Sequence, residues 1–146
     1  MKHLLKIVTT ILLLHGTAFS AFAEKQTPGP KGGKLLENDA PRAEFFVEKD
    51  HTVTVTFYDD SLKAVPHASQ VVTATAEAKD GKTKLEFDKK GDVLVSKSPL
   101  PHGDGYNIVV QLKKDPSAKP QNFRIKYDTH ICGECNRVEY ACTCEE

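Results

Sequence analysis

The chain has 146 residues with 20 basic side chains, 20 acidic side chains and six histidines. This balance argues against nucleic-acid binding, which requires a concentrated basic face, and against attachment to an anionic membrane surface. The length suffices for one domain, and Met1 is the only methionine, which excludes a methionine-rich copper site.

The first 23 residues have the features of a secretory signal peptide. Lys2 and Lys6 form a basic start, Ile11–Leu14 lies at the centre of an apolar stretch, and Ala21–Ala23 is a small-x-small cleavage site. A membrane anchor is the weaker interpretation, because polar residues interrupt a stretch that is already short for a ~20-residue span. We therefore expect a periplasmic or secreted protein whose mature chain has no membrane span and two more acidic than basic side chains.

Residues 24–42 are rich in proline and glycine and hold little that could pack, so we expect a linker there. From residue 43 the pattern changes to period two, which is typical of half-buried strands. In Thr52–Tyr58 the apolar side chains of Val53, Val55 and Phe57 alternate with threonines, which we expect to face water. Further strands are predicted at Glu44–Glu48, Val71–Ala78, Thr83–Asp88, Val93–Val95, Tyr106–Leu112 and Asn122–Tyr127.

Turn residues separate these runs. Asp80-Gly81 stands between two of them and is a strong hairpin signal, and Gly91-Asp92 marks a further turn. No segment has a sustained helical period. Seven short strands at this spacing predict an all-β fold, an antiparallel immunoglobulin-like β-sandwich over residues 43–128, followed by a cysteine-rich tail over 129–146.

All four cysteines lie in that tail, at Cys132, Cys135, Cys142 and Cys144. A C-x2-C pair can wrap a tight turn, for which Gly133 would supply the conformational freedom. The C-x-C pair has period-two spacing, so both sulfurs leave the same side of an extended segment. A chain reversal between the pairs would bring four thiolates together, as in a site for Zn²⁺ or Cu⁺.

His130 lies two residues before the first cysteine and could replace one thiolate as a metal ligand. Two alternatives to a metal site remain open. An even number of cysteines in an exported protein is typical of disulfides, for which three pairings exist. Cys132 and Cys135 could instead form a redox pair, although such pairs usually begin a helix of an α/β fold.

The sequence contains no nucleophile elbow, no H-E-x-x-H and no phosphate-binding glycine loop. We therefore expect a protein that is not an enzyme. The metal hypothesis makes it an exported metal-binding protein. The main alternative is a non-catalytic interaction module that binds a partner at a sheet edge and carries a disulfide-bonded tail.

Gly29–Leu36, Ala43–Glu48, Val53–Phe57 and Ser98–Leu112 resemble a small periplasmic β-domain associated with heavy-metal efflux adaptor proteins of resistance-nodulation-division systems. That pattern often has a histidine where this chain has Lys31, and it does not include the cysteine tail. The resemblance implies a periplasmic protein involved in metal handling, with an efflux or envelope protein as its partner.

Overall fold

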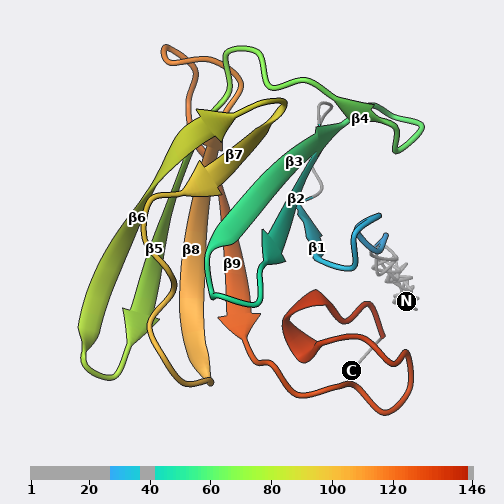
Figure 1. The fold of residues 1–146 in the computed structure, drawn as a ribbon, viewed down its shortest axis with the longest axis vertical. Coiled ribbons are helices and arrows are strands. Elements are labelled where there is room, and N and C mark those ends of the chain that lie inside the picture. Colours follow the sequence, from blue (N-terminus) through green and yellow to red (C-terminus); the bar gives the residue numbers. More distant parts are fainter. Residues whose placement is uncertain (1–26, 37–41, 145–146) are drawn as a thin grey trace, which may run out of the picture.

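The computed structural model describes residues 27–36 and 42–144 (Figure 1). The predicted signal peptide lies outside the described residues. The strands are β1 (Lys34–Leu36), β2 (Arg42–Val47), β3 (Val53–Tyr58), β4 (Ala64–Val65), β5 (Val71–Ala78), β6 (Gly81–Lys90), β7 (Val93–Ser96), β8 (Tyr106–Lys113) and β9 (Gln121–Tyr127). A 3₁₀ helix, η1 (Glu139–Ala141), lies in the tail. The described residues contain no helix long and apolar enough to cross a bilayer.

All strand pairs are antiparallel, and β6 joins two layers because it is long enough to pair on both sides. Its first half pairs with β5, and its second half, from Phe87 to Lys90, pairs with β7. The strand order is β1-β2-β3-β7-β6-β5-β8-β9, and β4 is attached to β3. In immunoglobulin terms, β2, β3, β7 and β6 correspond to strands A, B, E and D, while β5, β8 and β9 correspond to C, F and G.

This topology confirms the predicted all-β, immunoglobulin-like sandwich, and all seven predicted strands are present within two residues of their expected bounds. The hairpin predicted at Asp80-Gly81 joins β5 to β6, where Gly81 has a φ of 132°. At the start of β8, the Tyr106 hydroxyl donates to the carbonyl oxygen of Pro101 at 2.8 Å. This contact is the tyrosine corner of immunoglobulin-like domains.

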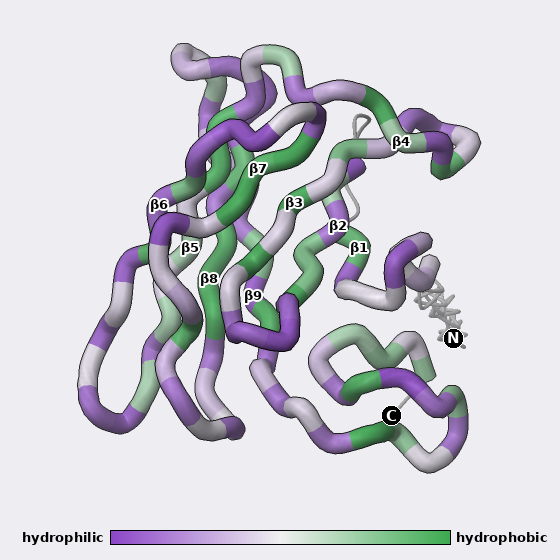
Figure 2. The backbone as a smooth tube through the Cα atoms, viewed as in Figure 1, coloured by the Kyte–Doolittle hydropathy of each residue, from purple (hydrophilic) through white to green (hydrophobic). Residues whose placement is uncertain are grey.

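The core lies between the two layers. Figure 2 shows hydrophobic stretches along β7 and β8 and hydrophilic residues in the turn that joins β5 to β6. The alternating residues of β3 and β8 face each other across the core: Val53, Val55, Phe57, Ile108, Val110 and Leu112. Each of these side chains is at most 6% exposed, which is the burial that their period-two spacing predicts.

Residues 29–36 differ from the expected linker over residues 24–42. They form a turn and then β1, which pairs with β2, and Leu35 and Leu36 are buried. The glycines allow this close approach, because a Cβ at Gly33 would overlap the carbonyl oxygen of Phe45. The sandwich therefore begins before residue 43.

A buried carboxylate fixes this turn. Glu44 of β2 is fully buried and accepts hydrogen bonds from the backbone N–H of Lys31 (2.9 Å) and of Gly33 (2.8 Å). The Tyr58 hydroxyl donates to its other oxygen at 2.7 Å, and burial together with this carboxylate raises the pKa of Tyr58. Three donors compensate the loss of water around the charge.

The prediction that the threonines of β3 face water is wrong. Thr54 is 6% exposed and Thr56 is 4% exposed. Thr56 is paired with Glu44 across the strands, under the 29–33 turn, and the Thr54 hydroxyl donates to Glu48 at 2.7 Å. Both faces of β3 are therefore buried, although its alternating sequence is typical of a strand with one face exposed to solvent.

Candidate metal centre

The tail folds back on itself directly after β9. Ile131 and Val138 form an antiparallel bridge, and the Cys132 N–H donates to the Arg137 carbonyl oxygen at 2.7 Å. The Asn136 N–H donates to the Cys132 carbonyl oxygen at 3.0 Å, which closes the turn around the first cysteine pair. η1 then reverses the chain once more and leads to the second pair.

The left-handed residue of this turn is Asn136, with a φ of 59°. The expectation that Gly133 supplies the special backbone conformation is therefore wrong, because Gly133 has no positive φ. Asparagine tolerates this conformation better than most residues with a side chain, so it takes the role that glycine often has. Cys142 has an extended conformation, with φ −63° and ψ 141°, as its place in the C-x-C pair predicts.

The four cysteine sulfurs lie close together in the structure. The Sγ of Cys142 lies 3.4 Å from that of Cys132 and 3.6 Å from that of Cys135, and the Sγ atoms of Cys132 and Cys144 are 3.9 Å apart. All four sulfurs lie within 4.8 Å of one another. Four sulfurs at the ~2.3 Å Zn–S distance of a tetrahedral site are ~3.8 Å apart, so the cluster has the dimensions of such a site.

All four cysteines are thiols in the structure. Their separations exceed the ~2.05 Å of a disulfide bond. The Cys142 sulfur is in contact with two others at once, whereas a disulfide would need one exclusive partner. If the tail were oxidised, the separations would permit one bond between Cys135 and Cys142 and another between Cys132 and Cys144.

Neighbouring thiols change one another's acidity. Burial acts to raise the pKa of Cys135, but the backbone N–H of Arg137 and hydrogen bonds from the other thiols outweigh it and lower this pKa to about 7. The pKa of Cys144 is raised, first by its hydrogen bond to Cys135. The cluster therefore holds one thiolate readily and retains protons on other sulfurs, which a cation at its centre would displace.

The tail is docked on the sandwich through Tyr140 of η1, which is 6% exposed. The Val47 N–H at the end of β2 donates to the Tyr140 hydroxyl at 3.1 Å, and the ring centroids of Tyr140 and Tyr127 are 5.8 Å apart. Ala141 beside it is fully buried. Figure 1 shows the tail turning back from the end of β9 toward β1 and β2. The segment between the two cysteine pairs is thus part of the core of the domain, which its sequence position alone does not show.

The structure places His130, which we expected could replace one thiolate as a metal ligand, apart from the four sulfurs. Its Nδ1 lies 2.6 Å from Asp128 Oδ1, and its side chain is 79% exposed. The hydrogen bond to Asp128 raises the pKa of His130, and the backbone N–H of His130 lowers the pKa of Asp128. The structure groups His130 with Asp104 and Asp128 at the surface, and it groups the four sulfurs separately.

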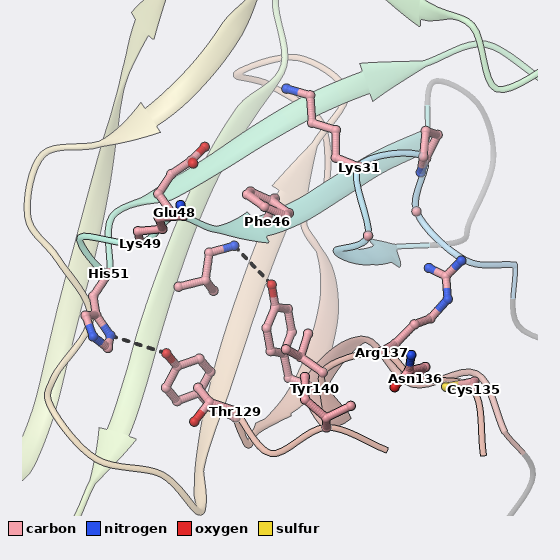
Figure 3. A pocket seen from close by; sticks show the side chains of 17 residues that line it. Lys31, Phe46, Glu48, Lys49, His51, Thr129, Cys135, Asn136, Arg137 and Tyr140 are labelled. Carbon is pink, nitrogen blue, oxygen red and sulfur yellow. Dashed lines mark hydrogen bonds between the residues drawn. The ribbon is translucent and has the colours of Figure 1, made fainter. Parts of the chain in front are cut away.

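A groove of about 780 Å³ separates the tail from the sandwich (Figure 3). One wall comes from the 29–32 turn and from the end of β2 with the residues that follow it, and the other comes from Thr129 to Tyr140. Cys135 lines the groove and is partly exposed, so the cysteine cluster adjoins this surface.

No protein-family model, curated protein or solved structure matches this chain.

Proposed function

We propose that this is a non-enzymatic, exported metal-binding protein that holds one Zn²⁺ or Cu⁺ ion through Cys132, Cys135, Cys142 and Cys144. The observation that carries the proposal is that all four sulfurs lie within 4.8 Å of one another, with three of their separations between 3.4 and 3.9 Å, close to the edge of a Zn–S₄ tetrahedron. Four cysteines within fifteen residues supply this set without any ligand from the sandwich.

Zn²⁺ is the cation we favour. A tetrahedral four-thiolate set with no open position is typical of structural zinc sites. Cu⁺ is the second candidate because soft thiolate ligands also favour it. In either case the metal would replace the protons that the raised pKa values of Cys142 and Cys144 leave on the sulfurs.

The metal would act by fixing the tail on the domain. Tyr140 and Ala141 lie between the two cysteine pairs and insert into the core. A metal that joins the pairs therefore holds the segment that carries these buried residues, and its binding free energy contributes to the stability of the docked tail.

Export is supported by the features of the first 23 residues. The resemblance to domains associated with heavy-metal efflux supports a role in metal handling, with an envelope protein as partner. The alternative of an interaction module with an oxidised tail draws support from the groove beside the tail.

The proposal is tested by zinc affinity, measured by competition with a chromophoric chelator, for each single Cys→Ser variant and for His130→Ala. We expect each serine variant to bind zinc more than ~100-fold more weakly, because loss of a ligand exceeds the 10- to 100-fold effect of outer contacts. His130→Ala should bind zinc like the wild type. Serine variants with unchanged affinity would refute the four-thiolate site.

A further inference from the structure

The groove between the sandwich and the tail has an apolar floor. Its lining includes Phe46 and Val47 from the sandwich and Ile131, Val138 and Tyr140 from the tail. Ile131 is 59% exposed, the largest exposed fraction among the large hydrophobic side chains that the structure describes. An exposed apolar side chain at the edge of a hollow is a feature of surfaces that a partner covers.

The charges around this floor are mainly positive. Lys31, Lys49 and Arg137 line the groove, and among the described lining residues Glu48 is the only carboxylate, although the Cys135 thiol also lies there. The Thr54 hydroxyl already donates to a carboxylate oxygen of Glu48. No acid in the described part of the chain forms an ion pair with any of the three cations.

These cations surround the apolar residues. Figure 3 shows Lys49 on one side of the groove and Arg137 on the opposite side, with Phe46 and Tyr140 between them. A ligand that contacts both sides must be elongated and must offer negative groups as well as apolar ones. The volume of about 780 Å³ lies within the ~300–1,000 Å³ range of ligand-binding clefts.

We infer that this groove binds a short, extended segment of a partner protein in which acidic and apolar side chains alternate. The acidic side chains pair with Lys31, Lys49 and Arg137, and the apolar ones cover Phe46 and Ile131. Because side chains of an extended peptide alternate in direction, one segment can present both kinds of contact.

The inference also rests on the proposed function in one respect, because the metal centre supports the tail wall of the groove. Arg137 and Val138 directly follow the turn closed by Cys132, whose N–H is bound to the Arg137 carbonyl oxygen. Removal of the metal frees this segment. We therefore expect the peptide to bind the metal-loaded protein more tightly than the chelated, reduced protein, and the metal to bind more tightly when the peptide is present.

The test uses the mature protein, zinc and a fluorescein-labelled peptide of alternating glutamate and leucine, with fluorescence anisotropy as the readout. A matched peptide has lysine in place of each glutamate. We expect the zinc-loaded protein to bind the acidic peptide, to bind the basic peptide at least ~tenfold more weakly, and to lose affinity as salt is raised.

Two charge-reversal variants locate the contact. Lys31→Glu/Lys49→Glu should bind the acidic peptide roughly tenfold more weakly, since two attractions become repulsions. Lys84→Glu/Lys90→Glu changes the net charge equally on β6, away from the groove, and should bind like the wild type. Equal binding of both peptides, absence of binding, or equal loss in both variants would overturn the inference.

Zinc stoichiometry, measured by native mass in the same samples, distinguishes this result from a failure of the proposed function. If the protein carries zinc and does not bind the acidic peptide selectively, the groove inference is wrong and the metal proposal stands. If the protein carries no metal and still binds the peptide through Lys31 and Lys49, the metal proposal and the predicted zinc dependence fail, whereas the groove assignment holds.

Discussion

The contact between the tail and the sandwich leads to a specific prediction for Tyr140. Its ring is 6% exposed and belongs to the core cluster, and its hydroxyl accepts the Val47 N–H at 3.1 Å. Replacing a buried aromatic ring by alanine typically costs ~3–5 kcal/mol, so Tyr140→Ala should lower the free energy of unfolding by an amount in this range. Removing only the hydroxyl leaves the Val47 N–H without its acceptor, so Tyr140→Phe should cost ~1–2 kcal/mol.

The assay is urea unfolding of the zinc-loaded protein, followed by far-ultraviolet circular dichroism because the chain has no tryptophan. A domain of this size has ~5–15 kcal/mol of stability, so both losses should shift the midpoint measurably. The comparison of the two variants separates the contribution of the ring from that of the hydrogen bond.

An unchanged midpoint in Tyr140→Ala would refute the reasoning, because it would mean that the tail is not part of the folded core. A loss in Tyr140→Phe as large as in Tyr140→Ala would also contradict it, since the ring would then contribute nothing beyond its hydroxyl.

Three further predictions concern the turn and the tail. Glu44→Gln should lower the unfolding free energy by about 2 kcal/mol or more in urea, because the buried carboxylate accepts hydrogen bonds from three donors. Gly33→Ala should cost ~1–3 kcal/mol in the same assay, because its Cβ would overlap the Phe45 carbonyl oxygen. His130 and Asp128 form an ion pair that stabilises the fold when the histidine is protonated and the aspartate is ionised. This contribution to stability is lost as the pH rises through the raised pKa of His130, and it is also lost in acid as the pH falls through the lowered pKa of Asp128. The stability difference between wild type and His130→Ala should therefore be larger near about pH 5 than near about pH 8, and a difference that grows toward high pH would contradict this sign.

The strands of the sandwich could be predicted because local sequence determines their alternation. Val53, Val55 and Phe57 face the core, as the period-two pattern predicts. The burial of Thr54 and Thr56 could not be predicted, since the turn that covers this face comes from residues 29–33 and carries no strand pattern. β1 was missed for the same reason: three residues after a glycine-rich turn are too few to show a period.

The cysteine cluster could be predicted from spacing because its four members lie close together in the chain. Its connection to the core could not, because Tyr140 contacts Val47 and Tyr127, which are distant in sequence. The groove has the same origin, since Arg137 lies across from Lys31 and Lys49 only when the tail is docked. A tail that inserts two buried residues stabilises the domain more than its short loops suggest.

The central claim is that the four cysteines hold one metal ion as thiolates. It is tested most directly by the native and denatured masses of the protein purified from cells that express the full chain, combined with thiol counting. The account predicts a native mass heavier by one metal ion and four titratable thiols after chelation. A mass lighter by four hydrogens, with no metal and no thiol, would contradict it and show that the tail carries two disulfides.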